Sequence, residues 1–198
     1  MFIYLKSINF LLISLIVILL NGCSSTNMKD FENKTPKLNL FEFFKGETVA
    51  YGIFEDRFGK LRRQFRVKIK GSVEENTLTL DEKFIYDDGE KATRIWKIKK
   101  INENNNLIKY EGSAEDVEGL ATGTSVGNAL NWTYDIYLNI KGSNLKVKFN
   151  DWIYKQDSNV AINRAYVSKF GIDIGSVTLV FLRGQTAKTV SPLNMNSW

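Results

Sequence analysis

The chain has 198 residues, with 27 Lys and Arg against 22 Asp and Glu, so its formal net charge is +5. It contains no histidine and one cysteine, Cys23. The sequence therefore excludes Ser-His-Asp triads, imidazole metal sites and disulfides within the chain, whereas carboxylate chemistry stays open.

An export signal begins the chain. Lys6 supplies positive charge, residues 10–20 form an apolar run broken only by Ser14, and residues 20–23 (Leu-Asn-Gly-Cys) form a lipobox. The run is typical of a signal peptide and is short for a membrane-spanning helix, which needs roughly 20 apolar residues. We expect cleavage before Cys23 and attachment of a diacylglyceryl chain to its thiol, with an uncleaved membrane anchor as the alternative.

The residue after the lipidated cysteine predicts where the protein is sorted. Ser24 stands where aspartate commonly retains a Gram-negative lipoprotein at the inner membrane. We therefore expect the periplasmic face of the outer membrane, with the membrane as a partner through Cys23. No nucleic-acid motif is present, and we expect no nucleic-acid partner.

The sequence divides into four segments. We expect the signal peptide at 1–22, the lipidated cysteine and a polar tether at 23–37, a β-barrel domain at 38–184 and a disordered tail at 185–198. The tether contains Pro36, and small polar residues dominate the tail.

A short helix is expected where the barrel domain begins. Leu40, Phe43 and Phe44 fall on one helical stripe within residues 38–44, and Gly46 ends the pattern. Such a helix would cap the domain.

The rest of the domain has the pattern of antiparallel strands. Apolar residues alternate with polar ones at 65–70, 78–80, 130–134 and 145–149, and turn residues separate the runs. About ten strands fit, with no room for crossover helices, and closure of the sheet removes its exposed edges. We predict an all-β fold, an antiparallel up-and-down barrel of the calycin or lipocalin type with a short N-terminal capping helix.

Several segments resemble those of a known family. They are 36–44 (PKLNLFEFF), 84–89 (FIYDDG), 150–154 (NDWIY) and 162–171 (INRAYVSKFG). In these segments the chain resembles the DUF3833 lipoproteins, bacterial proteins of unknown function, and the resemblance runs from about Pro36 to Arg183. It implies a lipocalin-like barrel on a lipid anchor, and it carries over no catalytic or binding residue.

Charged residues on apolar strand faces are candidates for a site inside the barrel. A two-residue turn within residues 157–159 would place Asp151 opposite or diagonal to Arg164, with Phe149 and Tyr166 on the same face. Similar alternation places three more charged residues on apolar faces, so the interior would carry a surplus of one positive charge. The candidate ligand-binding residues are Arg63, Glu82, Arg94, Trp96, Trp132, Tyr134, Phe149, Asp151, Arg164 and Tyr166.

Two interpretations of these residues stay open. In the first, the surplus arginine binds the carboxylate or phosphate of a fatty acid, phospholipid or other amphiphile, and the aromatic residues line an apolar cavity. In the second, the charges form internal ion pairs in a filled barrel whose outer face serves an envelope partner. An enzyme using Glu82 or Asp151 is disfavoured, because the predicted pairing places no second carboxylate beside either. We expect no cofactor and no metal.

Two further motifs are assigned to turns and bends. Gly119, Gly123 and Gly127 lack the lysine of a phosphate-binding loop and predict bulges or bends. Residues 87–90 (Asp-Asp-Gly-Glu) lack the full calcium-loop pattern and predict an acidic hairpin turn.

Overall fold

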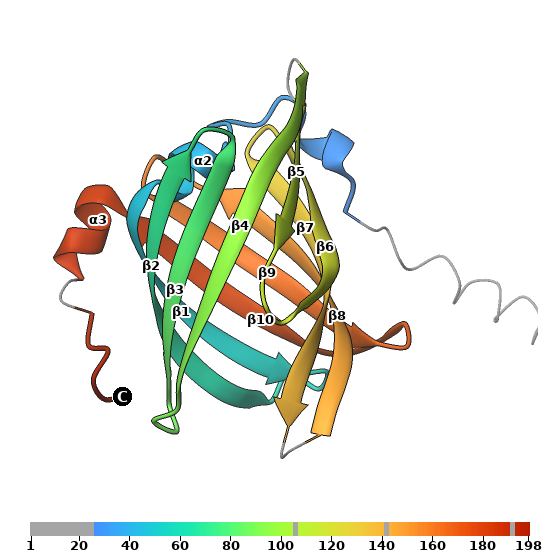
Figure 1. The fold of residues 1–198 in the computed structure, drawn as a ribbon, viewed down its shortest axis with the longest axis vertical. Coiled ribbons are helices and arrows are strands. Elements are labelled where there is room, and N and C mark those ends of the chain that lie inside the picture. Colours follow the sequence, from blue (N-terminus) through green and yellow to red (C-terminus); the bar gives the residue numbers. More distant parts are fainter. Residues whose placement is uncertain (1–25, 105–106, 141–142, 191–192) are drawn as a thin grey trace, which may run out of the picture.

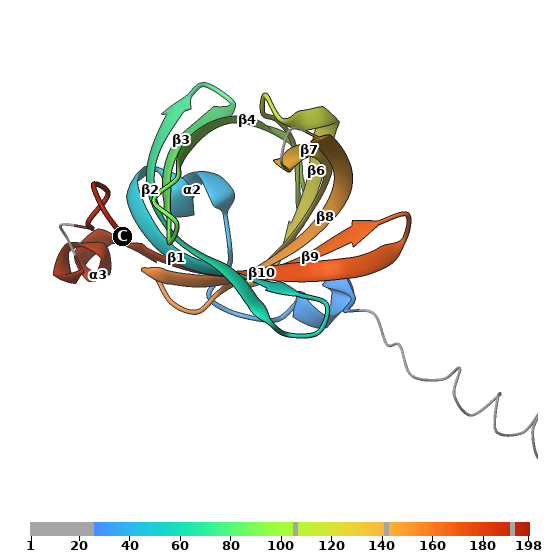
Figure 2. The ribbon, with the colours of Figure 1, turned by 90° about the horizontal axis from the view of Figure 1, so that it is seen from below.

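Ten antiparallel strands close into one barrel (Figures 1 and 2). The computed structural model describes residues 26–104, 107–140, 143–190 and 193–198. Each strand pairs with its neighbours along the chain, and β1 pairs with β10 to complete the ring. The predicted up-and-down barrel is confirmed.

The elements occur in the following order along the chain. The strands are β1 (Gly46–Asp56), β2 (Leu61–Glu74), β3 (Thr77–Tyr86), β4 (Lys91–Asn104), β5 (Leu107–Ser113), β6 (Val117–Val126), β7 (Ala129–Ile140), β8 (Ser143–Lys155), β9 (Val160–Lys169) and β10 (Ile172–Arg183). The helices are the 3-10 helix η1 (Met28–Phe31) and the α-helices α2 (Leu40–Phe44) and α3 (Gly184–Thr189).

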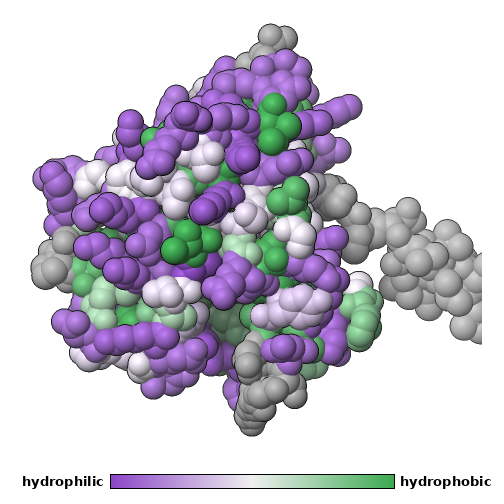
Figure 3. Space-filling view, in the orientation of Figure 1, coloured by the Kyte–Doolittle hydropathy of each residue, from purple (hydrophilic) through white to green (hydrophobic). Residues whose placement is uncertain are grey.

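Period-two alternation decides which side chains enter the barrel. In β2, Phe65, Val67 and Ile69 are buried, while Lys68 and Lys70 are exposed. Apolar side chains line the interior because removing each from water stabilises the fold by about 1.5–3 kcal/mol. Hydrophilic residues dominate the outer face shown in Figure 3, with hydrophobic residues scattered among them.

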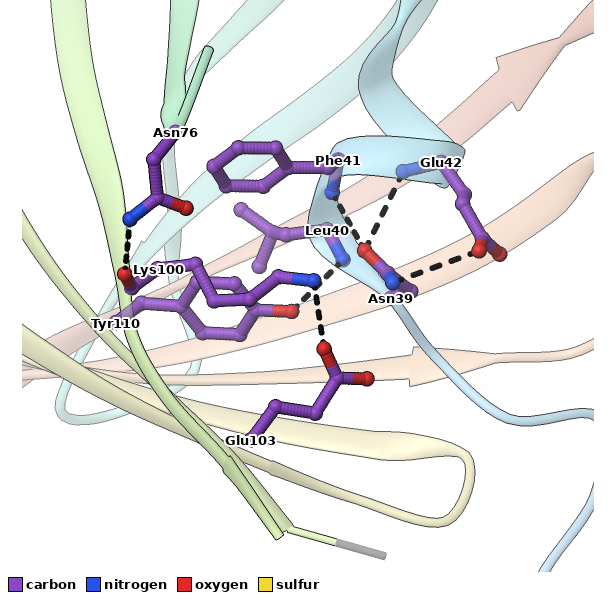
Figure 4. Close-up of polar contacts among 8 residues, drawn as sticks. All are labelled: Asn39, Leu40, Phe41, Glu42, Asn76, Lys100, Glu103 and Tyr110. Atoms are coloured by element: carbon purple, nitrogen blue, oxygen red, sulfur yellow. Dashed lines mark hydrogen bonds and ion pairs between the residues drawn. The ribbon is translucent and has the colours of Figure 1, made fainter. Parts of the chain in front are cut away.

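Helix α2 closes one end of the barrel, as the sequence predicted. In Figure 2 it lies within the outline of the ring, and Leu40, Phe43 and Phe44 are buried. The Asn39 side chain caps the helix by accepting hydrogen bonds from the backbone N–H groups of Phe41 (3.0 Å) and Glu42 (3.4 Å). The Tyr110 hydroxyl accepts a further bond from the Leu40 N–H at 3.3 Å (Figure 4).

The segment expected to be a tether is largely folded onto the barrel. The Phe31 ring lies 5.9 Å from the Trp152 ring on the outer face of β8, and the Leu38 N–H donates to the Gly127 carbonyl at 2.7 Å. Lys155 also donates from Nζ to the Lys37 carbonyl at 3.0 Å. Residues 28–37 of the expected tether thus lie against the barrel, with Phe31 packed on its wall.

The tail, expected to be disordered, is also ordered in part. Helix α3 follows β10 directly and buries Ala187. Arg66 on the barrel wall contacts the end of the chain, with its guanidinium 4.4 Å from the Trp198 ring centroid. The composition of a short polar segment does not reveal such a contact, because the contact needs only one arginine and one aromatic ring.

The two barrel ends differ. The end closed by α2 also carries the β2–β3 and β6–β7 turns, whereas the opposite end, here called the mouth, carries the β1–β2, β3–β4 and β9–β10 turns (Figure 1). None of the helices within the described residues is long and apolar enough to span a bilayer.

Glycines shape the wall at β6. Gly119 has a φ of +70° and lies where the β6–β7 register shifts, which confirms the predicted bulge there. Gly127 has a φ of +55° in the β6–β7 turn.

Candidate functional site

The barrel interior contains a partly open cavity of about 380 Å³. Its walls are mainly apolar and aromatic side chains from the strands, and Leu40 and Phe44 of α2 form its floor. Eight of the ten candidate residues line it: Arg63, Glu82, Arg94, Trp96, Trp132, Tyr134, Phe149 and Asp151. Most of the candidate residues therefore lie at the cavity, where they make up a minority of its lining.

Aromatic rings form one side of the cavity. The Trp96 ring lies edge-on to Trp132 at 5.7 Å and to Tyr134 at 5.3 Å, and Tyr134 stacks on Phe149 at 5.3 Å between centroids. Such arrangements stabilise aromatic pairs beyond simple burial.

Two glycines create the space for Trp132. Gly123 is its cross-strand partner, and a Cβ on Gly123 would overlap the indole ring. A Cβ on Gly112 would also lie only 2.8 Å from the ring. Because no side chain intervenes, the indole lies against the backbone of β5 and β6 and leaves its other face toward the interior.

Arg63 is neutralised at the mouth. Its Nη2 lies 2.9 Å from a carboxylate oxygen of Asp88 and also pairs with Glu90, both in the acidic β3–β4 turn that the sequence predicted. Its guanidinium lies 3.6 Å above the Tyr86 ring. Burial would lower the pKa of Arg63, but Glu90 and Asp88 outweigh it and the pKa is raised.

Arg94 is neutralised in the same way. Its Nη2 donates to Asp116, in the β5–β6 loop, at 2.6 Å. Burial would lower the pKa of Arg94, yet Tyr134, Glu82 and Asp116 together raise it. Arg94 therefore stays charged inside the barrel.

Glu82 stands across the strand pair from Arg94 without an ion pair to it. It is the register partner of Arg94, but within the described residues its carboxylate has no hydrogen bond and no cation within 4 Å. Burial raises the pKa of Glu82 to about 7, opposed by the charge of Arg94. The carboxyl is thus poised to lose its proton near neutral pH.

Asp151 is the second buried carboxyl. Its Oδ1 accepts a hydrogen bond from the Asn163 amide at 2.9 Å, and the Tyr134 hydroxyl lies beside it. Burial raises the pKa of Asp151 to about 6, against the lowering effects of Asn163, Tyr134 and Arg94. The Asp151 charge also contributes to the raised pKa of Glu82. The two carboxyls therefore share one cavity, contrary to the expectation that neither lies near a second carboxylate.

The predicted pairing of Asp151 with Arg164 is wrong. The observed register pairs Asp151 with Ala165 and Trp152 with Arg164, so Arg164 and Tyr166 point outward. Arg164 donates to the Thr178 hydroxyl at 2.7 Å and lies 3.5 Å from Glu55, away from the cavity.

The length of the β8–β9 loop explains the error. The loop has three residues, 157–159, closed by a hydrogen bond from the Gln156 N–H to the Val160 carbonyl at 2.9 Å. Asp157 stabilises it by accepting from the N–H groups of Asn159 and Val160. One residue more than a two-residue turn moves every side chain of β9 to the opposite face.

The same shift explains a residue that the sequence argument missed. Asn163 lines the cavity beside Asp151, and it would have been found only if Asp157 had been recognised as the capping residue of a three-residue loop. Asp116 was missed because it lies in a loop, where alternation gives no signal.

The lipobox lies outside the described residues. Among the described residues, no group of three or more His, Cys, Asp or Glu side chains is arranged to hold a metal ion.

Comparison with protein families gives one match, to the model described as "Protein of unknown function (DUF3833)", over residues 17–183. The chain belongs to the DUF3833 family. No curated protein matches this DUF3833 chain.

One solved structure supports the fold. The S-type phycobiliprotein lyase CPES from Guillardia theta matches with a TM-score of 0.55 and 9% identity, over 81% of this chain and 98% of that one. A redesigned β-barrel, mFAP1, bound to DFHBI, matches with a TM-score of 0.37 and 10% identity, over 72% of this chain and 97% of that one. At such identities the likeness extends to the fold alone, a calycin-like barrel.

Proposed function

We propose that this DUF3833 protein is an envelope lipoprotein, anchored through Cys23, whose barrel binds a small amphipathic molecule. The observation that carries the proposal is the apolar cavity inside the barrel, with a polar cluster on its wall. Binding sites of proteins commonly combine an apolar lining with a few converging polar groups. The likeness of the fold to that of a phycobiliprotein lyase is in keeping with the proposal.

The cavity volume limits the size of the ligand. About 380 Å³ lies within the range of roughly 300–1,000 Å³ of small-molecule sites. It would accommodate about a dozen water-sized groups at roughly 30 Å³ each. A medium-length acyl or alkyl chain, or one end of a longer lipid, fits this volume.

The structure does not place the expected arginine partner of the ligand's polar group in the cavity. A carboxylate or phosphate was expected to meet a surplus interior arginine, but Arg164 lies on the outer wall, which leaves two arginines and two carboxyl groups of the candidate set at the cavity. The amphiphile proposal therefore rests on the cavity and no longer on a surplus arginine.

Two features of the sequence support the envelope location. The lipobox ending at Cys23 supports lipid attachment, and Ser24 supports the periplasmic face of the outer membrane. Incorporation of labelled palmitate into the full chain, and its loss in Cys23→Ser, would support the anchor. A wild-type chain that incorporated no labelled palmitate and stayed in the soluble fraction would overturn the proposed anchor.

The test of binding is mass spectrometry of an organic extract. The chain from Ser24 to Trp198 includes all the contacts described, and it would be exported behind a cleavable signal peptide and purified without detergent. A stoichiometric small molecule supports binding. A clean extract, together with no change of tryptophan emission on adding fatty acids, lysophospholipids or alkylamines, would favour a barrel that holds no ligand and serves a partner with its outer face.

A further inference from the structure

The charges of the cavity arginines are already satisfied at the mouth. Arg63 is held by Asp88 and Glu90 from the β3–β4 turn, and Arg94 is held by Asp116 at 2.6 Å. An anionic head group would have to compete with these carboxylates and approach two further ones in the cavity. The electrostatics of the cavity therefore disfavour an anion.

Most of the groups left without partners at the cavity are acceptors, with the Arg63 Nε as a donor among them. Glu82 has no hydrogen bond or ion pair within the described residues, and it lines the cavity. Near it, Asp151 Oδ2 and Asn163 Oδ1 are buried and accept no hydrogen bond of good geometry among the described residues, although the Tyr134 hydroxyl lies beside the Asp151 carboxylate. A buried charge without a partner costs several kcal/mol, so a ligand that brings a cation would relieve it.

Aromatic faces stand next to these acceptors. Asp151 is the cross-strand partner of Trp132, and the Trp96 ring lies within 5.7 Å of Trp132 and 5.3 Å of Tyr134. The faces of such rings attract cations through their quadrupole, most strongly for tryptophan, and aromatic pockets are used to hold quaternary ammonium groups. The carboxylates and the rings therefore both favour a cation with N–H donors, beside the Arg94 guanidinium, which lies 6.0 Å from the Trp96 ring centroid.

We propose that the ligand is an alkylammonium amphiphile, whose cationic head lies between the Glu82 and Asp151 carboxylates and the Trp96–Trp132–Tyr134 wall. Its apolar chain occupies the part of the cavity lined by α2, where Leu40 and Phe44 form the floor. This inference rests on the proposed ligand-binding function, and it adds that the head group of the ligand carries a positive charge.

The test compares three probes with the same chain and different heads. Octylammonium, octanol and octanesulfonate would be titrated calorimetrically into the chain from Ser24 to Trp198 at pH 8.5, where Glu82 is ionised because its pKa is about 7. We expect the ammonium to bind at least tenfold more tightly than either competitor. Glu82→Gln should reduce its affinity about tenfold, while Glu74→Gln, at an exposed site on β2, should leave it unchanged.

The outcomes separate this inference from the function on which it rests. Equal or tighter binding of octanol or octanesulfonate would overturn the ammonium assignment and leave a binding barrel in place. Binding of none of the three would overturn the assignment and count against the binding function as well. Should Glu82→Gln fail to fold by circular dichroism, Asp151→Asn supplies the second variant, with the same expected loss of preference for the cation.

Discussion

Replacing Glu82 with glutamine should stabilise the barrel relative to the wild type, and this gain in the free energy of unfolding should be larger at high pH than at low pH. The half-buried Glu82 carboxyl lines the cavity without a hydrogen bond in the described residues, and desolvation there raises its pKa from 4.5 to about 7. The folded chain therefore holds this proton more tightly than the unfolded chain. The contribution of this proton to the free energy of unfolding is fully present below about pH 4.5. It is lost as the pH rises to about 7, because the unfolded chain releases the proton at a lower pH than the folded chain does.

The size of the effect follows from the shift. At about 1.4 kcal/mol per pKa unit, the rise from 4.5 to about 7 corresponds to about 3 kcal/mol. Glutamine has nearly the same shape and does not titrate. The free energy of unfolding of Glu82→Gln minus that of the wild type should thus increase by about 3 kcal/mol between pH 4 and pH 8.

Urea unfolding monitored by circular dichroism at half-unit pH steps measures this difference. Glu74→Gln is the matched control, since Glu74 is exposed, and its difference should stay flat. In an Asp151→Asn background the Glu82 transition should move to lower pH, because the Asp151 charge is one cause of the raised pKa. A difference for Glu82→Gln that varied by less than about 0.5 kcal/mol over the range would refute the placement of an unpaired carboxyl in the cavity.

Three other substitutions test separate parts of the structure. Gly123→Ala should cost about 1–3 kcal/mol in urea unfolding, because the new methyl group overlaps the Trp132 ring; Thr122→Ala, on the exposed face beside it, should cost less than about 0.5 kcal/mol. Asn39→Ala should lower the free energy of unfolding by about 1 kcal/mol, because α2 loses its cap, and an unchanged value would show that packing alone holds the helix. Arg164→Ala should cost less than about 1 kcal/mol and leave probe affinity unchanged, since its ion pair with Glu55 is partly exposed. A loss of binding in Arg164→Ala would contradict the observed register of β9.

Sequence reasoning succeeded where one regular pattern determines the structure. Alternation in β2, β3 and β4 placed Arg63, Glu82 and Arg94 on the inner face, because each strand's own residues decide that face. It failed at β9, where the face depends on the number of residues in the preceding loop. There the Asp157 cap makes the loop one residue longer than the assumed turn.

The segments outside the strands were predicted less well for a different reason. Packing of Phe31 on Trp152 and of Trp198 near Arg66 joins positions far apart in sequence, and no local periodicity announces such contacts. Composition alone indicated a tether and a disordered tail, because it does not show that one aromatic side chain packs against the barrel.

The docking of η1 limits how far the barrel can stand from its lipid. With residues from Asn27 onward held against the wall, four peptide units join Cys23 to Asn27, and a fully extended chain of that length spans only about 14 Å. In the proposed anchored form, the α2 end would therefore lie near the bilayer surface, since Leu38 is bonded to the β6–β7 turn at that end. The mouth, with Arg63 and the acidic β3–β4 turn, would then face the aqueous compartment. A ligand would therefore exchange with solvent or with soluble carriers at the mouth, and it would not enter the barrel directly from the membrane that holds the anchor.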